Sequence, residues 1–592
     1  MLQTSDPSGA DSPIVHEITP GESNVRTLVH EYGGGAWWPA HGDLYYVELA
    51  DQRLRRVSPG GEPVFLTEEP ESPRGIRYAD GVVTLDGGWT VCVRERHGEG
   101  EPANELVAIA TDGSGEVRVL WAGSDFVMSP RLSVEGDQLA WISWDHPEMP
   151  WTNTTLHVHA FDDGSLGEEI VRLGGDRSLC EPGWGPHGLR VVSDHDEWWG
   201  LYDVDLATGT LEAKVSGPFE IATPPWVFGM QRWAAPLVGG SQEKVFAVAG
   251  LPTGDELIID GRTITTIDSS INSMSPHHGS ADVSYAGSGY DHDVEVVTVR
   301  LDDEGGFRRQ VVRPARTLPF DRGFLVEPEW ISFPTGDDGA ATAHALFYPP
   351  TNPDHVGPTG EKPPLLVLAH GGPTAQARRQ LQSSILYWTS RGIAVVDVDY
   401  RGSTGYGRTY RQALDGQWGI ADVEDCVAAA SYLADRGDVD AERLMIRGGS
   451  AGGFTVLSAL AFHDTFAAGA SRYGVADLEA LATDTHKFEA RYLDSLVGPY
   501  PEAKSVYDAR SPINHVDQLR APMIVLQGDE DAIVPPNQSE MIVDALKANG
   551  VEVEYLLFEG EQHGFRKSDN IVTALEAELG FFGRILGFDP AR

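Results

Sequence analysis

Two patterns of hydrophobic and polar positions divide the chain. From about residue 33 to residue 312, short apolar segments are separated by Gly, Pro, Asp and Asn, with almost no helical periodicity. This pattern predicts β-strands joined by tight turns. Beyond about residue 329, continuous apolar runs alternate with stretches of helical spacing. Such alternation is typical of a parallel sheet covered on both faces by helices.

Within the first region a weak repeat is visible. Its units recur every 40 to 60 residues and each contains several strand-like runs. The aligned starts of five units lie at Pro73, Pro130, Pro182, Pro225 and Pro276. A sheet of this size cannot bury its faces alone, so we predict a β-propeller of stacked blades, with a pair of β-sandwiches as the alternative. We count six units, the first opened by residues 32–38, and residues 13–30 are candidates for part of a seventh.

The second region alternates between predicted strands and helices. Apolar runs typical of strands buried on both faces lie at 365–369, 393–398, 523–526 and 555–558. Helical periodicity lies at 374–391, 421–436, 452–462, 537–549 and 570–586. We therefore expect a disordered N-terminal segment (1–12), a β-propeller domain (13–320) and a doubly covered α/β domain (321–592). In such sheets the chemistry gathers at the carboxyl ends of the strands.

One turn in the second region has the pattern of a nucleophile elbow. Ser450 has glycines two positions away on either side, and it lies between the apolar run 444–446 and a helical stretch. A Gly-x-Ser-x-Gly turn from strand to helix exposes the serine hydroxyl and aims the next amide, that of Ala451, at a developing oxyanion. The alternative is an incidental serine in a Gly-rich turn, because the pattern alone is weak.

A serine nucleophile needs a base, and the base needs an orienting acid. His563 is the only histidine after Ser450 in a loop that directly follows a predicted sheet strand. The acid is Asp529, Glu530 or Asp531, which spacing cannot separate. The order Ser, Asp, His is that of an α/β-hydrolase fold, which we predict for residues 321–592. Three other histidines are expected to be structural or surface groups: His463, His486 and His515.

Other motifs are assigned more simply. The glycines that follow His370 form a turn whose backbone N–H groups suit an oxyanion hole, and His370 itself is expected to be structural. The Gly-rich loop 400–407 lacks the Gly-Lys-Ser/Thr ending of a phosphate-binding loop. His157 and His159 share one strand face, but no third ligand follows at useful spacing, so polar strand residues are expected. We therefore expect neither a metal nor a cofactor.

Several motifs together resemble one family. In the second region they are His-Gly-Gly-Pro at 370–373, Asp-Tyr-Arg-Gly-Ser-Thr-Gly-Tyr-Gly at 399–407, the elbow at 448–453, the segment 528–535 and Gln-His-Gly-Phe at 562–565. In the first region they are Glu-Tyr-Gly-Gly-Gly-Ala at 31–36 and the segment 144–151. With these motifs the chain resembles the prolyl oligopeptidase family of serine peptidases, in particular its acylaminoacyl peptidase and dipeptidyl aminopeptidase-like bacterial branch.

The resemblance implies specific roles. The family pattern Gly-x-x-Asp-x-x-Val-Pro falls on 528–535 and selects Asp531 as the acid. The prolyl oligopeptidase subgroup has a tyrosine where this chain has His370. The resemblance therefore implies that the amides of Gly372 and Ala451 form the oxyanion hole, as in acylaminoacyl peptidases. It also implies a propeller that covers the active site and admits only short or unstructured substrates.

Two departures from the family pattern are visible. The family propeller usually has seven blades, whereas little sequence precedes the motif at 31–36, so the first blade is expected to be incomplete or the chain to begin late. The glutamate pair with which dipeptidyl peptidases hold a free amino terminus has no assigned counterpart, because Glu68–Glu69 and Glu168–Glu169 both have the character of turn residues.

The predicted function is that of a serine exopeptidase acting on short peptides, with acylaminoacyl, dipeptidyl or aminoacyl release. Ser450 attacks, His563 transfers the proton, Asp531 orients the imidazole, and the amides of Gly372 and Ala451 bind the oxyanion. One alternative is an amidase or esterase that acts on small aminoacyl conjugates, as the resemblance to puromycin-hydrolysing members permits. Another is a propeller that serves as an interaction platform beside an inactive hydrolase domain.

The composition narrows the classes of molecule that the protein is expected to bind and the cellular compartment in which it is expected to lie. The 592 residues carry a formal net charge of -45, which disfavours nucleic acid and anionic lipid as partners. The three cysteines, Cys92, Cys180 and Cys426, are far apart, as is typical of a reducing compartment. No apolar run is long enough to cross a bilayer, and the first dozen residues lack the order of a signal peptide. A cytoplasmic protein is expected, and its oligomeric state is not predicted.

Overall fold

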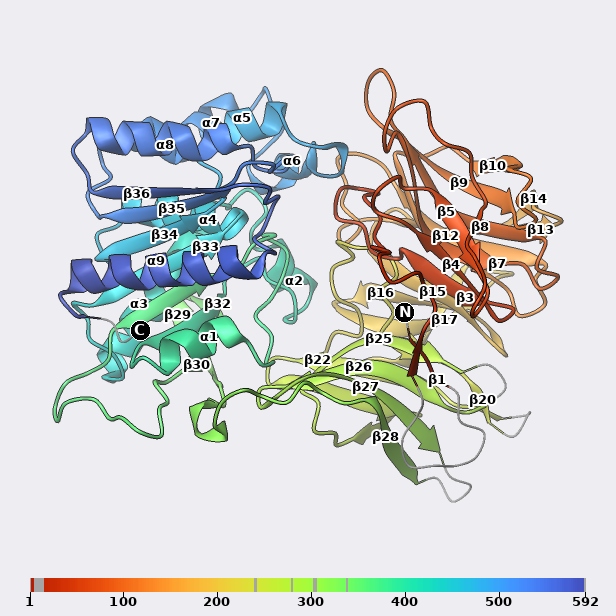
Figure 1. The fold of residues 1–592 in the computed structure, drawn as a ribbon, viewed down its shortest axis with the longest axis horizontal. Coiled ribbons are helices and arrows are strands. Elements are labelled where there is room, and N and C mark those ends of the chain that lie inside the picture. Colours follow the sequence, from red (N-terminus) through yellow and green to blue (C-terminus); the bar gives the residue numbers. More distant parts are fainter. Residues whose placement is uncertain are drawn as a thin grey trace. The chain divides into compact units, whose positions relative to one another are not determined.

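The computed structural model describes residues 2–4, 15–238, 242–277, 280–301, 306–336 and 339–589. The chain forms two compact units, which are coloured along the sequence in Figure 1. The first unit comprises Met1–Leu251, Asp255–Gly287 and Val294–Ala315. The second comprises Pro252–Gly254, Ser288–Asp293 and Arg316–Arg592. Domain boundaries at residues 320 and 321 remain a prediction.

The first unit contains six four-stranded sheets among its described residues. The first three are β3 (Trp37–Ala40), β4 (Asp43–Val47), β5 (Leu54–Val57) and β6 (Val64–Phe65); β7 (Ile76–Val83), β8 (Trp89–Arg96), β9 (Ala103–Ala110) and β10 (Val117–Trp121); and β11 (Phe126–Leu132), β12 (Gln138–Trp144), β13 (Thr155–Asp162) and β14 (Ser165–Gly174). The last three are β15 (Leu179–Gly185), β16 (Gly188–Asp196), β17 (Trp198–Asp205) and β18 (Thr210–Val215); β19 (Trp233–Ala234), β22 (Phe246–Leu251), β23 (Gly254–Ile259) and β24 (Arg262–Ile264); and β25 (Ser270–Pro276), β26 (Val283–Gly289), β27 (His292–Leu301) and β28 (Phe307–Arg313).

These sheets are the blades of a six-bladed β-propeller. The strand that opens one blade contacts the strand that opens a neighbouring blade, as for β3 with β7, β7 with β11, β11 with β15, and β19 with β25. The propeller predicted from the sequence repeat is confirmed, and the β-sandwich alternative is wrong because six separate sheets stack through their opening strands.

The remaining short strands do not build a further blade. The first blade has all four strands, so it is not incomplete. The two-stranded pairs are β1 (Leu2–Thr4) with β2 (Val15–Glu17), and β20 (Leu237–Val238) with β21 (Gln242–Glu243). Within the described ranges no seventh four-stranded sheet exists, and most of the segment predicted to be disordered, residues 1 and 5–12, lies outside them.

Polar side chains on the opening strands connect neighbouring blades. The Asp80 carboxylate accepts hydrogen bonds from the Ser129 amide (2.8 Å) and from Arg131 (3.0 Å) in the next blade. In the same way the Glu181 carboxylate accepts a hydrogen bond from the Arg232 amide (2.7 Å). Both acids are buried and have positive φ, where each opening strand departs from regular pairing. At these two blade boundaries, an acid of one blade thus satisfies a buried backbone amide of the next one.

The second unit is built on one eight-stranded sheet with the order β29-β30-β32-β31-β33-β34-β35-β36. The strands are β29 (Glu329–Thr335), β30 (Ala341–Tyr348), β31 (Leu365–Ala369), β32 (Ala394–Asp399), β33 (Leu444–Gly449), β34 (Ala468–Arg472), β35 (Met523–Gly528) and β36 (Val553–Phe558). The first two pairings, β29 with β30 and β30 with β32, are antiparallel, and the other five are parallel. This is the α/β-hydrolase architecture expected from the alternating pattern.

Helices of the second unit pack against this sheet (Figure 1). Those that contact it are α1 (Ser383–Thr389), α3 (Ala421–Arg436), α4 (Ala451–Phe462), α8 (Pro536–Ala548) and α9 (Ser568–Leu586). The other helices of the unit are α2 (Arg408–Gln412), α5 (Leu478–Thr483), α6 (Tyr492–Leu496) and α7 (Lys504–Arg510), with the short 3-10 helices η1 (Arg322–Phe324), η2 (Lys487–Glu489) and η3 (Pro512–His515). Trp388 of α1 and Phe582 of α9 share one apolar cluster with the sheet. No helix among the described residues is both long enough and apolar enough to span a membrane.

Three expectations about local structure are wrong. The helix predicted at 374–391 forms only over Ser383–Thr389, because the preceding segment is held by tertiary hydrogen bonds, including one from the Ala377 amide to Asp399 (2.6 Å). The run at 555–558 belongs to an edge strand that is half exposed, with Leu557 49% exposed, and is not buried on both faces. Glu168–Glu169 do not lie in a turn but in β14, where strand pairing holds them.

Candidate active site

Ser450 occupies the turn between β33 and α4. Its backbone has φ 56° and ψ -122°, a conformation that residues with side chains rarely adopt. The Ser450 amide donates to the carbonyl of Arg472 at the end of β34 (3.0 Å), and its carbonyl accepts from the Phe454 amide (3.1 Å). The strained turn is therefore held on both sides by backbone hydrogen bonds, as a nucleophile elbow requires.

Two glycines allow the strand and the helix to come this close. A Cβ atom on Gly448 would lie 2.2 Å from the carbonyl oxygen of Gly452. A Cβ on Gly452 would lie 2.1 Å from the carbonyl oxygen of Ala369, at the end of β31. Neither position has room for a side chain, so the glycines on either side of Ser450 are required by packing.

His563 and Asp531 lie in the two loops that follow β36 and β35. The Nδ1 atom of His563 is 2.8 Å from Oδ2 of Asp531, whose side chain is fully buried. The other oxygen of Asp531 accepts hydrogen bonds from the amides of Ile533 (2.9 Å) and Val534 (3.0 Å). Gln527 approaches Oδ2 at 3.4 Å. The carboxylate is thus held in one orientation toward the imidazole.

The two other candidates for the acid lie at the surface. Asp529 and Glu530 are exposed, and Asp529 accepts a hydrogen bond from the Gly560 amide (2.7 Å). Of the other histidines, His463 is exposed, His486 lies 3.6 Å from Glu489, and His515 packs against Phe462. Within the described part of the chain, only Asp531 forms a carboxylate pair with His563.

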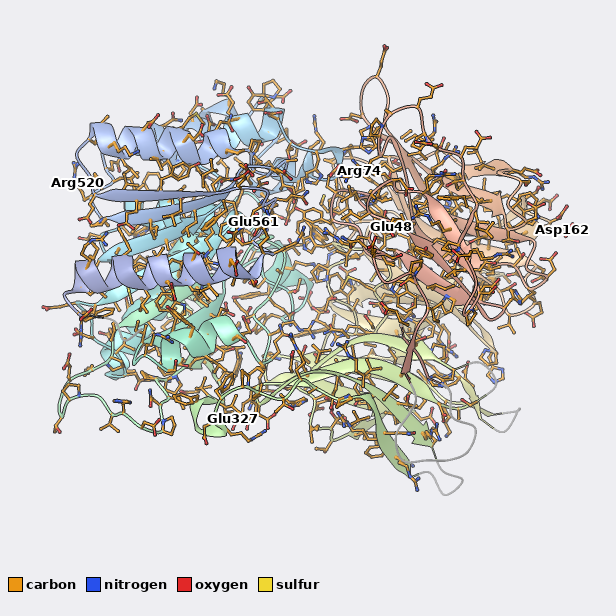
Figure 2. All side chains as sticks on the ribbon, viewed as in Figure 1. Glu48, Arg74, Asp162, Glu327, Arg520 and Glu561 are labelled. Carbon is orange, nitrogen blue, oxygen red and sulfur yellow. The ribbon has the colours of Figure 1, made fainter. Side chains whose placement is uncertain are left out.

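Glu561 organises the loop that carries His563, and it is labelled in Figure 2. Its buried carboxylate accepts hydrogen bonds from the amides of Arg566 (3.0 Å) and Lys567 (2.9 Å) and from Asn570 (2.9 Å). Burial alone would raise the pKa of Glu561, but these hydrogen bonds lower it below its usual value. By accepting these hydrogen bonds, the charged carboxylate holds together the two ends of the loop that carries His563. No sequence motif indicated this role.

Tyr473 borders both His563 and the turn at Ser450. Its ring centroid lies 4.8 Å from that of His563. A Cβ on Gly449, the residue before Ser450, would lie 3.0 Å from the Tyr473 ring. No hydrogen bond between Ser450 and His563 occurs among those found within the described residues. Catalytic hydrogen bonds in ligand-free enzymes are often long and tighten only when substrate binds.

The turn after β31 lies against the elbow. A Cβ on Gly371 would be 3.5 Å from the Cβ of Ser450 and 3.2 Å from the carbonyl oxygen of Gly449. Gly372 follows with φ 120°. Ala451 is the first residue of α4, where helical amides have no acceptor within the helix. The amides of Gly372 and Ala451 are therefore the candidates for an oxyanion hole.

His370 holds this turn in place. Its Nε2 is 2.8 Å from the Ser403 hydroxyl and its Nδ1 is 2.9 Å from the carbonyl oxygen of Gly371. The Tyr400 hydroxyl donates to the carbonyl of His370 (2.9 Å). Burial lowers the pKa of His370 to about 4, so the ring is neutral near pH 7. These contacts are those of a structural residue.

A buried ion cluster joins α9 to the two strands next to the turn at Ser450, β33 and β34, and it was not predicted from the sequence. Glu578 of α9 has a fully buried side chain and accepts hydrogen bonds from Arg472 at 2.6 and 2.7 Å. Arg447 of β33 lies 3.2 Å from the same carboxylate. Burial, with Arg472 nearby, lowers the pKa of Arg447 to about 10. The only sequence signal is a charged residue within an apolar strand three positions before Ser450.

Known proteins show similarity to this chain. A family model described as "Prolyl oligopeptidase family" matches residues 379–589. The dipeptidyl aminopeptidase BIII of Pseudoxanthomonas mexicana is 29% identical over 267 residues, which are 44% of this chain and 39% of that protein. The acylamino-acid-releasing enzyme of Arabidopsis thaliana is 34% identical over 215 residues, which are 34% of this chain and 28% of that protein. The chain thus matches well under half the length of these curated relatives.

Among solved structures the similarity extends over almost the whole chain. A puromycin-hydrolysing peptidase of Mycobacterium tuberculosis has a TM-score of 0.91 and 37% identity, covering 98% of this chain and 90% of that one. A mutant of puromycin hydrolase complexed with PGG has a TM-score of 0.90 and 37% identity, covering 99% of this chain and 93% of that one. Both units align with these puromycin-hydrolysing peptidases, and the family model spans the loops of the second unit that carry Ser450, Asp531 and His563. The chain therefore belongs to the prolyl oligopeptidase family.

Proposed function

We propose that this chain is a serine peptidase that releases an aminoacyl, dipeptidyl or acylaminoacyl group from short peptides. The observation that carries the proposal is the 2.8 Å pair between His563 and the buried Asp531, in loops of the same sheet that holds Ser450 in a strained elbow. Membership of a family of peptidases supports it.

In the proposed mechanism the Ser450 hydroxyl attacks the scissile carbonyl while Nε2 of His563 takes its proton. Asp531 holds the imidazole through Nδ1 and stabilises the imidazolium. The amides of Gly372 and Ala451 bind the oxyanion, and each such donor typically contributes about 2.7–4 kcal/mol. His563 then gives its proton to the leaving amine, and water releases the acyl group from Ser450 by the same steps.

The substrate is proposed to be a short peptide or an acyl or aminoacyl amide. Release of a single aminoacyl group, with an amidase acting on small conjugates as its extreme case, is favoured by one observation. The solved structure of a puromycin-hydrolysing peptidase matches this chain with a TM-score of 0.91 and 37% identity. That of an acylaminoacyl peptidase of Pyrococcus horikoshii, over a similar share of the chain, has a TM-score of 0.52 and 17% identity. The net charge of -45 further disfavours nucleic acid as a partner. A cytoplasmic location remains a prediction.

The test is a panel of anilides with free aminoacyl, acetyl-aminoacyl and dipeptidyl groups, assayed with the wild type and with Ser450→Ala. We expect the wild type to hydrolyse at least one class and the variant to lose about 10⁶-fold in kcat, the loss typical when a triad serine is removed. Turnover of free aminoacyl anilides alone, without cleavage of any short peptide, would leave the amidase and exclude the peptidase. Equal turnover by the wild type and the variant would refute the role of Ser450, and no turnover of any anilide by the folded wild type would revive an interaction propeller with an inactive hydrolase.

A further inference from the structure

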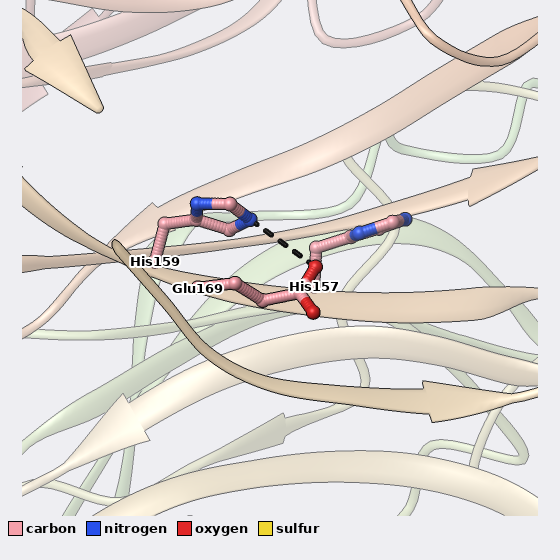
Figure 3. Close-up of side chains that lie close together, drawn as sticks. All are labelled: His157, His159 and Glu169. Atoms are coloured by element: carbon pink, nitrogen blue, oxygen red, sulfur yellow. Dashed lines mark ion pairs between the residues drawn. The ribbon is translucent and has the colours of Figure 1, made fainter. Parts of the chain in front are cut away.

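Three potential metal ligands meet on one blade of the propeller. His157 and His159 lie two positions apart on β13, so they share one face of the blade. Glu169 of β14 is the residue paired with His159. One nitrogen of each histidine and one oxygen of the carboxylate lie within 4.8 Å of one another. Figure 3 shows the three side chains close together, with the ion pair between His159 and Glu169 dashed.

Each ring has one nitrogen that makes a hydrogen bond and one that makes none among the described residues. Nε2 of His157 is hydrogen-bonded to the Ser143 hydroxyl (2.8 Å), and Nδ1 of His159 is 3.2 Å from the carbonyl oxygen of Gly167. Because a carbonyl only accepts, Nδ1 of His159 carries a proton, so in the neutral ring the lone pair is on Nε2, which a metal ion would bind. Nδ1 of His157 and Nε2 of His159 are buried and have no hydrogen-bond partner among the described residues.

This arrangement is unusual for buried polar atoms. His157 is 2% exposed, yet its Nδ1 is unsatisfied, although buried polar atoms nearly always have a partner. The rings of Trp121 and Trp141 pack against His157 at 4.8 and 4.9 Å and exclude water from one side. Metal-bound histidines characteristically engage their second nitrogen with a carbonyl or a hydroxyl, which fixes the ring and its tautomer, inside an apolar shell. Both histidines here have that second contact.

The geometry points to a zinc site formed by Nδ1 of His157, Nε2 of His159 and the Glu169 carboxylate. Two imidazoles and a carboxylate are a ligand set that suits Zn²⁺, with water as the fourth ligand. Ligands at about 2.0–2.2 Å from a tetrahedral ion are about 3.3–3.5 Å from one another. Nε2 of His159 and Glu169 are already 3.5 Å apart. The other two separations between ligand atoms are at most 4.8 Å, and the Glu169 side chain, which is 43% exposed, is the most mobile of the three ligands.

Arg172 is the competitor for this site. Its Nε lies 3.3 Å from the Glu169 carboxylate, and its side chain is 51% exposed. A zinc ion would replace this cation as the partner of Glu169, and the exposed guanidinium is free to move into solvent. A second cluster, Glu31, Glu95 and His97, fits a metal less well, because the better-buried Arg77 bridges both of its carboxylates.

The sequence did not indicate the third ligand. We expected no metal because none followed His157 and His159 at useful spacing along the chain. Glu169 comes instead from the next strand, and the pairing of β13 with β14 places it opposite His159. The supposed turn residue is thus a candidate ligand.

The test is a titration of chelator-treated, full-length protein with Zn²⁺, using a chromophoric chelator as competitor. Glu169→Gln and His159→Asn remove ligands and are expected to weaken binding at least about 100-fold, since loss of a mere outer partner of a ligand already costs about 10–100-fold. Glu168→Gln is the matched control, because it loses the same charge at the neighbouring exposed position of β14. Its affinity is expected to match the wild type.

Arg172→Gln distinguishes a metal site from simple charge attraction at the surface. Removing the competing cation is expected to tighten Zn²⁺ binding at least about 3-fold. Co²⁺ should give the intense visible bands of a tetrahedral site in the wild type and in Glu168→Gln, and not in Glu169→Gln. Absence of Zn²⁺ binding at micromolar concentration, or equal affinities of Glu168→Gln and Glu169→Gln, would overturn the assignment.

Discussion

Substitution of Glu578 by glutamine tests how the second unit supports the turn at Ser450. Glu578 is the only carboxylate in contact with Arg447 and Arg472 among the ion pairs of the described residues. Arg472 in turn provides the carbonyl that accepts the Ser450 amide. Loss of the charge therefore affects both the buried cluster and the strand end that holds the elbow.

The magnitude follows from the burial of the cluster. The Glu578 side chain is 0% exposed and the side chains of Arg447 and Arg472 are each 12% exposed, so water has little access to replace the lost carboxylate. Removal of one partner from a buried ion pair typically costs about 3–5 kcal/mol, because the other charge stays buried and unpaired. A glutamine oxygen can still accept from one arginine, but its amide group opposes the N–H groups of the other. We therefore expect a loss of about 3–5 kcal/mol in the free energy of unfolding.

Urea unfolding followed by circular dichroism at 222 nm measures this loss. The signal reports on helices, and every helix among the described residues lies in the second unit. Glu576→Gln is the matched control, since Glu576 is exposed on the same helix and a surface change of this kind alters stability by about 0.5 kcal/mol or less. If Glu578→Gln unfolds at the same urea concentration as Glu576→Gln, the cluster does not stabilise this unit and the reasoning fails.

Two further predictions concern the triad and a buried acid of the propeller. Asp531→Asn keeps the fold but presents an amide to Nδ1 of His563, so kcat is expected to fall about 10⁴-fold in anilide hydrolysis, and a loss below tenfold would contradict the proposed role. Glu181 is buried, and burial raises its pKa to about 7, so the folded state disfavours the charged form and stability falls as pH rises from about 4.5 through 7. Glu181→Gln should remove this fall, about 2–3 kcal/mol between pH 5 and pH 8 in thermal unfolding, and an unchanged pH dependence would contradict it.

Strong periodicity made much of the fold predictable. The helix expected at 421–436 is α3, which ends where Gly437 adopts a left-handed conformation, as glycine does after helices. The repeat of strands predicted six blades because each blade is a separate run of four consecutive or nearly consecutive strands along the chain. In contrast α2, α5, α6 and α7 have five to seven residues each, too few for a periodic pattern to be recognised.

The candidate site was only partly predictable, because burial and strand pairing do not appear in local spacing. Asp529, Glu530 and Asp531 are consecutive, and only their environments separate them, with Asp531 buried beside His563. Glu578 joins the elbow from a helix more than a hundred residues downstream, so no local motif marks it. Glu169 likewise meets His159 only through the pairing of two strands.

Active-site labelling with a fluorophosphonate, followed by mass spectrometry, tests the central claim most directly. The account predicts one modified residue, Ser450, with anilide hydrolysis lost in proportion to labelling and no labelling in His563→Ala. Modification of a different residue, or a folded wild type that hydrolyses anilides while Ser450 stays unmodified, would contradict it.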